Sequence, residues 1–542
     1  MTENYDLEQQ ETQAPENQVN VEKILLDKSN VDEDPITSTI EQPSTSNSSL
    51  KKPTNWVDKI GLRINAEIRG IERVPESERH DNSLLSPFLV FLSPNMVISG
   101  LSIGSLGPVA YNLDFRTSII IITIFCIIGS IPVGFFSAFG MRFGIRQQIL
   151  SRYFTGNIMG RIFALFNVIS CIGWNAVNVI PCAQLLNSVG PLPPWAGCLI
   201  LVGCTCIFAV FGYKTVHLYE KYSWIPNFIV FMIIIAKFSQ THAFNWGEKK
   251  SGPTEAGNVL NFISAIFGFT VGWIPLLADY TVYMPANTNP WKVAFAMTTG
   301  LSLPAMFTAI LGAAIGTSVN LKGSRFEQAY NKNSTGGLIY EILCGDNNNQ
   351  GYRFIIVVFA LGAIANGIPG SYSLSLAIQC IWSQCARVPR IAWCILGNLV
   401  ALAFSILAYY KFQDTMSNFL SIIAYNVSIY LSISLTEHFI YRRGFSGYDV
   451  TDFNNYKTMP VGIAGVVAFC FGICSTVLSM NQTWYQGVIA RKIGDSGGDI
   501  SFEMNIMFAF IGYNLVRPFE LKYFGRWSKK PYQELDSFCR VI

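Results

Sequence analysis

Apolar stretches of about 20 residues, separated by short polar links, recur along the chain between about residues 87 and 517. A helix of about 20 apolar residues can cross the ~30 Å hydrocarbon core of a bilayer. This length criterion gives about twelve stretches, at about 87–109, 117–139, 159–187, 194–213, 223–240, 257–278, 294–317, 354–382, 391–410, 417–440, 460–480 and 501–517. The pattern therefore predicts an all-α membrane protein with about 12 transmembrane helices.

Three of these stretches are interrupted midway by residues that break helices. The interruptions are Ser93-Pro94-Asn95 in the first, Gly272-Trp273-Ile274-Pro275 in the sixth and Asn366-Gly367-Ile368-Pro369-Gly370 in the eighth. Unpaired backbone amides are costly in lipid, so broken helices persist at membrane depth where they line a cavity. Broken spans at matching positions of two halves are typical of secondary transporters. The offset of five between the first and sixth spans predicts a five-plus-five inverted repeat followed by two C-terminal helices.

The polar ends of the chain predict three further segments. Residues 1–55 are polar and acidic, with a Ser/Thr-rich stretch, and should form a disordered cytoplasmic tail. Residues 56–86 have the pattern of an amphipathic juxtamembrane segment. The transporter domain should occupy residues 87–517, followed by a cytoplasmic C-terminal tail at 518–542.

The composition excludes several other classes of protein. Half of the residues are apolar, 13% are charged and the mean hydropathy is +0.33, which is incompatible with a set of soluble domains. A net charge of +3 does not indicate nucleic acid as a partner. Most of the 13 cysteines lie inside the apolar stretches, with no Cys/His spacing typical of a metal site. We therefore expect no metal, no cofactor and, without a nucleophile–base pair among the spans, no enzyme.

The distribution of arginine and lysine predicts the orientation of the chain. The link after the second stretch carries four arginines (Arg142, Arg146, Arg152 and Arg161), and the link after the third carries no charge. Basic links face the cytoplasm, so both termini should be cytoplasmic. The sequons at Asn333 and Asn481 then fall in outer loops.

Two tryptophans are the best candidates for a ligand site. Trp174 and Asn178 are four residues apart in the third stretch, on one helix face, where an indole and a carboxamide could receive a flat, hydrogen-bonding ring. Trp273 follows Gly272 at the interruption of the sixth stretch, where unwound backbone could add donors and acceptors. Helix packing and an interfacial position are the structural alternatives for these side chains.

Two polar residues at the other interruptions could contribute to the same site. Asn366 lies beside Gly367 and Pro369, whose backbone would be freed by a helix break. Ser93 flanks Pro94 and could bond the ligand or the freed backbone. Local capping is the alternative at both positions.

Sequence motifs extend this picture from residue 60 to residue 527. The chain resembles the fungal purine–cytosine permeases of the nucleobase–cation symporter family one. The resemblance rests on these motifs: Ser93-Pro-Asn-Met96, Leu106-Gly-Pro108, Arg146-Gln-Gln-Ile-Leu-Ser-Arg-Tyr153, Gly173-Trp174 with Asn178, Tyr219-Glu-Lys with Trp224-Ile-Pro-Asn227, Phe267 to Pro285, Glu437-His-Phe with Arg442-Arg443, Gly497-Gly-Asp499 and Glu520 to Arg526.

The resemblance implies a fold like that of the bacterial leucine transporter and cation-driven uptake of nucleobases at the plasma membrane. It implies that Trp174 and Trp273 form an aromatic clamp. By the same resemblance, Asn178, Asn366 and Ser93 would contact the base.

One motif departs from the family pattern. Similar permeases read Ala-Asn-Asn-Ile-Pro-Asn, whereas this chain has glycine at positions 367 and 370. Two amides that similar proteins place around the substrate are absent, and each buried hydrogen bond contributes ~0.5–1.5 kcal/mol. Another planar heterocycle, such as pyridoxine, is therefore an alternative substrate, and a non-transporting nutrient sensor is an alternative function.

The same eighth stretch bears on the coupling ion. Sodium-coupled members of this fold hold the ion partly with paired hydroxyls there, but Tyr352 to Gly370 contains neither serine nor threonine. Because hard cations need oxygen ligands, we favour proton coupling. Glu220, which corresponds to a carboxylate implicated in transport in similar permeases, and Asp279 are the candidate proton carriers. The alternatives are an ion pair for Glu220 and a helix-end contact for Asp279.

Overall fold

The computed structural model describes residues 70–345, 350–450, 453 and 459–524. Within these residues the regular secondary structure is helical, apart from one isolated bridge between Asn481 and Gln486, and turns and loops join the helices. The expected tail at 1–55, the first part of the 56–86 segment and the last 18 residues of the chain, 525–542, lie outside the described residues.

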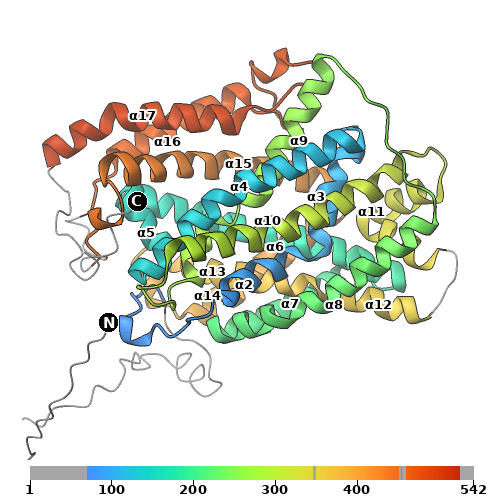
Figure 1. Cartoon of the computed structure of the whole chain (residues 1–542), viewed down its shortest axis with the longest axis horizontal. Helices are drawn as coiled ribbons and strands as arrows, with labels where there is room; N and C mark the ends of the chain where they lie inside the picture. The colour runs from blue at the N-terminus through green and yellow to red at the C-terminus, as the bar shows by residue number, and fades with distance from the viewer. Residues whose placement is uncertain (1–69, 346–349, 451–452, 454–458, 525–542) are drawn as a thin grey trace, which may run out of the picture. The chain divides into compact units, whose positions relative to one another are not determined.

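A helix, or a pair of helices joined at a break, occupies each apolar stretch predicted from the sequence (Figure 1). In chain order these are α2 (Leu85–Asn95) with α3 (Ile98–Val109), α4 (Phe115–Phe143), α6 (Asn157–Val189), α7 (Pro194–Phe211), α8 (Tyr213–Gln240), α9 (Pro253–Val271) with η2 (Ile274–Tyr280), α10 (Pro290–Gly316), α12 (Gln350–Leu361) with α13 (Ala363–Ile381), α14 (Arg390–Ala408), α15 (Phe412–Thr436), α16 (Ile463–Ser479) and α17 (Ser501–Phe524). Two helices in the links were not expected: α5 (Gln147–Thr155) and α11 (Arg325–Cys344).

The length and composition of these helices are those of a multi-pass membrane protein. Eight helical stretches of the described chain are long and apolar enough to cross a membrane, and the bent α2–α3 pair makes a ninth. One of the eight, Arg390–Tyr441, contains both α14 and α15. The 17-residue α16 is apolar but shorter, and it packs against α17, beside which it lies in Figure 1.

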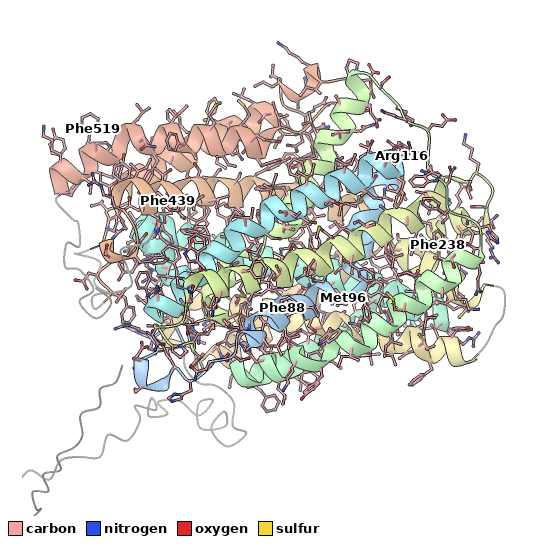
Figure 2. The ribbon with its side chains drawn as sticks, viewed as in Figure 1. Phe88, Met96, Arg116, Phe238, Phe439 and Phe519 are labelled. Atoms are coloured by element: carbon pink, nitrogen blue, oxygen red, sulfur yellow. The ribbon has the colours of Figure 1, made fainter. Side chains whose placement is uncertain are left out.

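The outward faces of the helices are apolar, as a lipid environment requires. On α4, Ile120, Ile124 and Ile131 recur at helical spacing and are 57%, 46% and 57% exposed. Phe439 and Phe519, labelled in Figure 2, are exposed as well. A stripe of this kind would be exposed to water in a soluble protein, whereas in a bilayer it contacts acyl chains.

The first span is broken as predicted. Proline 94 lacks a backbone N–H, and Val97 is extended, so α2 and α3 meet at an angle of 55°. Two carbonyls at the break accept from side chains, because Asn95 Nδ2 donates to Phe91 O at 2.7 Å and Asn366 Nδ2 donates to Pro94 O at 2.7 Å. The break therefore has its own hydrogen bonds inside the protein.

The sixth span is also broken as predicted. Helix α9 ends at Val271, and after Gly272 and Trp273 the chain continues as the tighter 3₁₀ helix η2. Two glutamines of α5 hold this segment: Gln148 Nε2 donates to Pro275 O at 2.5 Å, and Gln147 Oε1 accepts from Ala278 N at 3.2 Å. Helix α5 thus fixes the second half of the broken span.

The eighth span breaks at a different place from the one predicted. Helix α13 runs without interruption through Gly367, Pro369 and Gly370, and the break lies at Gly362. A proline inside a helix removes one hydrogen bond and can be tolerated where neighbouring groups compensate. Gly362 lies so close to Asn227 of α8 that a β-carbon there would be 2.5 Å from its amide. The prediction of a break at Gly367 and Pro369 was therefore wrong.

The described part of the expected juxtamembrane segment, residues 70–84, contains one short 3₁₀ turn, Glu76–Glu78. Buried Arg79 holds this segment against the bundle. It donates to Val74 O and to Met141 O of α4 and forms an ion pair with Glu76. At the other end, α17 continues to Phe524, so residues 518–524 are helical.

Candidate binding site

Trp174 and Trp273 line one cavity at the break of the sixth span. The other residues of its wall are Cys171, Gly272, Leu276, Asn366 and Gly370. The cavity is small, with a volume of about 20 Å³. The side chains must move apart before a heterocycle can enter.

Trp174 is held in place by two aromatic neighbours and by a glycine. Its ring makes an edge-to-face contact with Phe419, at 5.4 Å between centroids, and a tilted contact with Phe269 at 6.2 Å. A β-carbon at Gly272 would be 2.9 Å from the indole, so the ring lies against the backbone at the break. Trp174 is thus positioned by the element that carries the second tryptophan.

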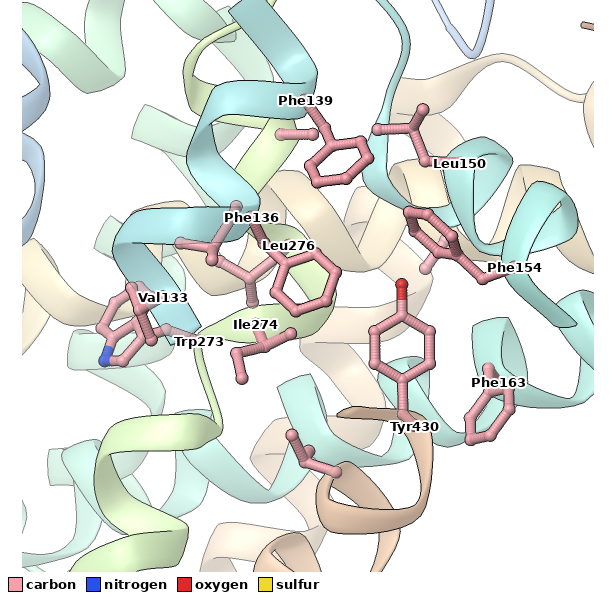
Figure 3. Close-up of a cluster of buried hydrophobic side chains, with 14 of the residues drawn as sticks. Val133, Phe136, Phe139, Leu150, Phe154, Phe163, Trp273, Ile274, Leu276 and Tyr430 are labelled. Carbon is pink, nitrogen blue, oxygen red and sulfur yellow. The ribbon is translucent and has the colours of Figure 1, made fainter. Parts of the chain in front are cut away.

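Trp273 lies where the cavity meets a large apolar cluster. Figure 3 shows its indole beside Val133, at the edge of a group that includes Ile274 and Leu276. It makes an edge-to-face contact with Phe91 of α2 at 5.0 Å and is 7% exposed. The aromatic wall therefore joins the broken first and sixth spans.

Asn178 and Asn366 form one hydrogen-bonded chain. Asn178 Nδ2 donates to Asn366 Oδ1 at 2.7 Å, and Asn366 Nδ2 donates in turn to Pro94 O. Asn366 lines the cavity, while Asn178 stands behind it and also donates to Trp174 O. The structure brings the two asparagines together but places only Asn366 at the cavity wall.

Ser93 and Glu220 lie together, away from the cavity wall. Ser93 Oγ is 2.5 Å from Ser223 Oγ of α8, and the Glu220 carboxyl group lies beside both hydroxyls. Glu220 is fully buried, and neither of its oxygens has a hydrogen-bond partner of ordinary geometry in the described chain. The loss of hydration of this buried carboxyl group is therefore poorly offset by hydrogen bonds.

Asp279 has a contrasting environment. Its Oδ1 accepts from Gln147 N at 3.1 Å and its Oδ2 accepts from Ser373 Oγ at 2.9 Å. Its backbone carbonyl accepts from Arg146 at 3.0 Å. Both carboxylate oxygens of Asp279 thus have hydrogen-bond donors, and these bonds link η2 to α5 and α13.

Comparison with known proteins assigns this architecture to a family. Residues 73–490 match the family model described as permease for cytosine/purines, uracil, thiamine, allantoin. The chain belongs to this family. It is therefore a multi-pass membrane permease, and the resemblance noted from its motifs is confirmed.

Two curated relatives and one solved structure give the permease its context. The purine-cytosine permease FCY2 of Saccharomyces cerevisiae is 46% identical over 495 residues, covering 90% of this chain and 93% of FCY2. The vitamin B6 transporter TPN1 of the same yeast is 27% identical, covering 90% and 93%. The transporter Mhp1, solved in a closed conformation with bromovinylhydantoin bound, has a TM-score of 0.64 at 13% identity, covering 87% of this chain and 98% of Mhp1. The predicted transporter fold is confirmed by this likeness.

The two glycines of the eighth span of the permease have different surroundings. Gly370 lines the cavity, and a β-carbon there would make an ordinary van der Waals contact, 3.4 Å from Asn175 Oδ1. Gly367 faces α7, where a β-carbon would be 2.7 Å from Cγ2 of Thr205. Of the two positions, only Gly370 is therefore placed to change the shape of the cavity directly.

Sequence reasoning missed several residues around this site. Cys171 and Leu276 line the cavity, but neither differs from an ordinary apolar residue of a span. Gln147 and Gln148 hold η2 from a link, and only their place in a family motif drew attention to them. Asn175, next to Trp174, was passed over because adjacent residues of a helix face different directions.

Proposed function

We propose that this permease imports a nucleobase of the cytosine or purine type across the plasma membrane by proton symport with alternating access. The observation that carries the proposal is that Trp174 and Trp273, with Asn366, line a single cavity at a helix break. Indole rings offer apolar faces to a flat ring, and the carboxamide lies at its edge. The name of the relative FCY2 supports the same class of substrate.

The small volume of the cavity supports an alternating-access cycle. A nucleobase does not fit into space that barely holds a water molecule, so the walls must separate to admit it. The walls come from the sixth span, α6 and α13, and Phe91 of α2 packs against Trp273 of the wall. Movement of these elements against one another would open the site to one side of the membrane at a time.

We place the coupled proton on Glu220 rather than on Asp279. A buried carboxyl group that lies beside two hydroxyls inside a membrane is accommodated best in its neutral, protonated form. Ser93 on α2 and Ser223 on α8 are hydrogen-bonded to each other, and both hydroxyls lie beside the Glu220 carboxyl group. Separation of α2 from α8 would open this contact and let water take the proton, which links release of the proton to movement of the first span.

A second substrate class is favoured by one observation. Gly370 has no side chain at the cavity wall, so a substituent of the pyridoxine ring could occupy the space left there. The similarity to the vitamin B6 transporter TPN1 covers nearly the whole chain, although at lower identity than that to FCY2. Competition between pyridoxine and nucleobases decides between these substrates, and the absence of any flux would favour the nutrient-sensor alternative.

The test is uptake in cells that lack their own nucleobase carriers, with a panel of purines, pyrimidines and pyridoxine at two pH values. Trp174→Ala and Trp273→Ala should each abolish uptake while the protein still reaches the plasma membrane. Trp291→Ala is the matched control, because Trp291 is 62% exposed at the start of α10. Normal transport by either clamp variant would contradict the stacking site at that residue.

Proton coupling has its own test. Substrate-linked proton uptake should be lost in Glu220→Gln and retained in Asp279→Asn protein that folds. The exposed loop residue Glu248 provides the control Glu248→Gln. Proton uptake that survives in Glu220→Gln would remove this residue from the coupling mechanism.

The proposed topology places both termini in the cytoplasm, flanking a transporter domain at residues 87–517. It rests on the basic link between α4 and α6, since Arg142, Arg146 and Arg152 lie at one end of the bundle. Tags at the two termini should be labelled only in permeabilised cells.

A further inference from the structure

The wall of the cavity has a notch at Gly370. This residue lines the cavity and has no side chain. In the described chain, a β-carbon placed there would meet one atom outside its own helix within 4 Å, namely Asn175 Oδ1 at 3.4 Å. The notch therefore ends at the amide oxygen of Asn175, a residue of α6 that is 3% exposed.

A chain of buried hydrogen bonds fixes the orientation of this amide. Asn398 Nδ2 donates to Cys394 O at 2.8 Å, so its oxygen is left to accept from Ser371 Oγ at 3.0 Å. Ser371 has then used its only proton, and its oxygen accepts from Asn175 Nδ2 at 3.2 Å. The amide nitrogen of Asn175 therefore faces Ser371, and its amide oxygen faces Gly370.

The other amides near the cavity are less available to a ligand. Asn366 uses its nitrogen for Pro94 O and its oxygen for Asn178. The oxygen of Asn178 has no partner in the described residues, and neither Asn178 nor Asn175 is part of the cavity wall. Asn175 differs in that its oxygen lies 3.4 Å from the β-carbon position of Gly370, so it is reached through the opening at that wall residue.

We propose that Asn175 Oδ1 accepts a hydrogen bond from an exocyclic amino group of the transported heterocycle, which reaches it through the notch at Gly370. The inference rests on the proposed nucleobase site and adds a residue that determines specificity. An amino group protrudes from the edge of a ring and fits the notch, whereas a ring N–H lies flush with the edge. A carbonyl group in the notch would face the amide oxygen and be disfavoured.

The proposal predicts selectivity between rings that differ by one amino group. Adenine should bind more tightly than purine, and cytosine more tightly than pyrimidin-2-one, by about 2- to 10-fold, as expected for one neutral hydrogen bond. Asn175→Ala removes the acceptor, and Gly370→Ala fills the notch with a methyl group. Each variant should bring the two inhibition constants of a pair together by a similar factor.

The measurement is competition against uptake of a radiolabelled nucleobase by protein at the cell surface. Gly203→Ala is the matched control, since a β-carbon at this α7 position would meet nothing within 4 Å. The double variant should show no greater loss of selectivity than either single variant, because both remove the same bond. If Asn175→Ala protein does not reach the cell surface, the result for Gly370→Ala alone decides the proposal.

Unchanged ratios in both single variants would overturn the inference, as would wild-type protein that does not distinguish the members of a pair. An equal loss of affinity for both members in Gly370→Ala would reveal a purely steric effect and would also overturn it. Failure of the proposed function looks different: wild-type protein would then show no nucleobase uptake to compete with.

Discussion

The indole of Trp174 lies against the backbone of Gly272, on the element that carries the second tryptophan of the cavity. A β-carbon at position 272 would stand 2.9 Å from Cζ2 and 3.0 Å from Nε1 of Trp174. Contacts this short force one of the partners to move. Glycine at this position therefore sets how closely the third and sixth spans approach at the cavity.

We predict that Gly272→Ala reduces uptake strongly, by displacing the Trp174 ring toward the space the substrate needs. Overpacking of this kind costs about 1–3 kcal/mol, which corresponds to roughly 5- to 150-fold in an equilibrium constant. The apparent affinity for a nucleobase, measured by competition, should fall accordingly. The control Gly203→Ala should leave affinity unchanged, and wild-type affinity in Gly272→Ala would show that the ring has room to adjust.

The positions of the two tryptophans could be predicted from the sequence because a strong local signal marks each. Trp273 follows glycine and precedes proline within an apolar stretch, and Trp174 stands one helical turn from Asn178. The breaks of the first and sixth spans were located by the same kind of signal. These features depend on residues that are neighbours in the chain.

What escaped prediction depends on contacts between distant residues. The break of the eighth span lies at Gly362, where the chain closely approaches Asn227 of α8, whereas the local signal of Pro369 predicts it elsewhere. The role of Asn175 depends on Ser371 and Asn398, which belong to two other helices. Only the folded bundle brings these groups together.

Gly367 and Thr205 form a second tight contact, between α13 and α7. A β-carbon at 367 would be 2.7 Å from Cγ2 and 2.9 Å from Oγ1 of Thr205. Gly367→Ala should therefore destabilise the permease by about 1–3 kcal/mol, seen as a lower thermal unfolding midpoint in detergent. Thr205→Ala removes both atoms, so the double variant should recover most of this loss. A midpoint unchanged by Gly367→Ala would mean that α7 can move away without cost.

Asp499 is expected to make stability depend on pH. It lies in the loop between α16 and α17, 1% exposed, where it accepts from the Tyr425 hydroxyl and from Ser501 N and Asn481 N. Burial raises its pKa from 3.8 to about 6. The folded protein therefore binds this proton more tightly than the unfolded chain, so stability should rise as pH falls through 6 toward 4.

Between pH 7 and pH 5 this group alone should add about 1 kcal/mol to the free energy of unfolding. The unfolding midpoint in detergent should show the increase in wild-type protein and in the exposed-residue control Glu248→Gln. Asp499→Asn should show an increase that is smaller by about this amount. The same pH dependence in Asp499→Asn would assign it to another group.

Both sequon asparagines use their amide nitrogens inside the fold, and we predict that protein at the cell surface carries no glycan on either. Asn333 Nδ2 donates to Asn187 Oδ1 and Ser188 Oγ, each at 3.0 Å, and Asn481 Nδ2 donates to Asn261 Oδ1 and Ser496 O, each at 3.1 Å. A glycan is attached through this same nitrogen, so it would displace one bond and place a bulky group within the contact. Enzymatic deglycosylation should leave the electrophoretic mobility of the permease unchanged, as should Thr335→Ala and Thr483→Ala, which remove the sequons. A mobility shift that either substitution abolishes would show that the segment around that asparagine rearranges to expose it.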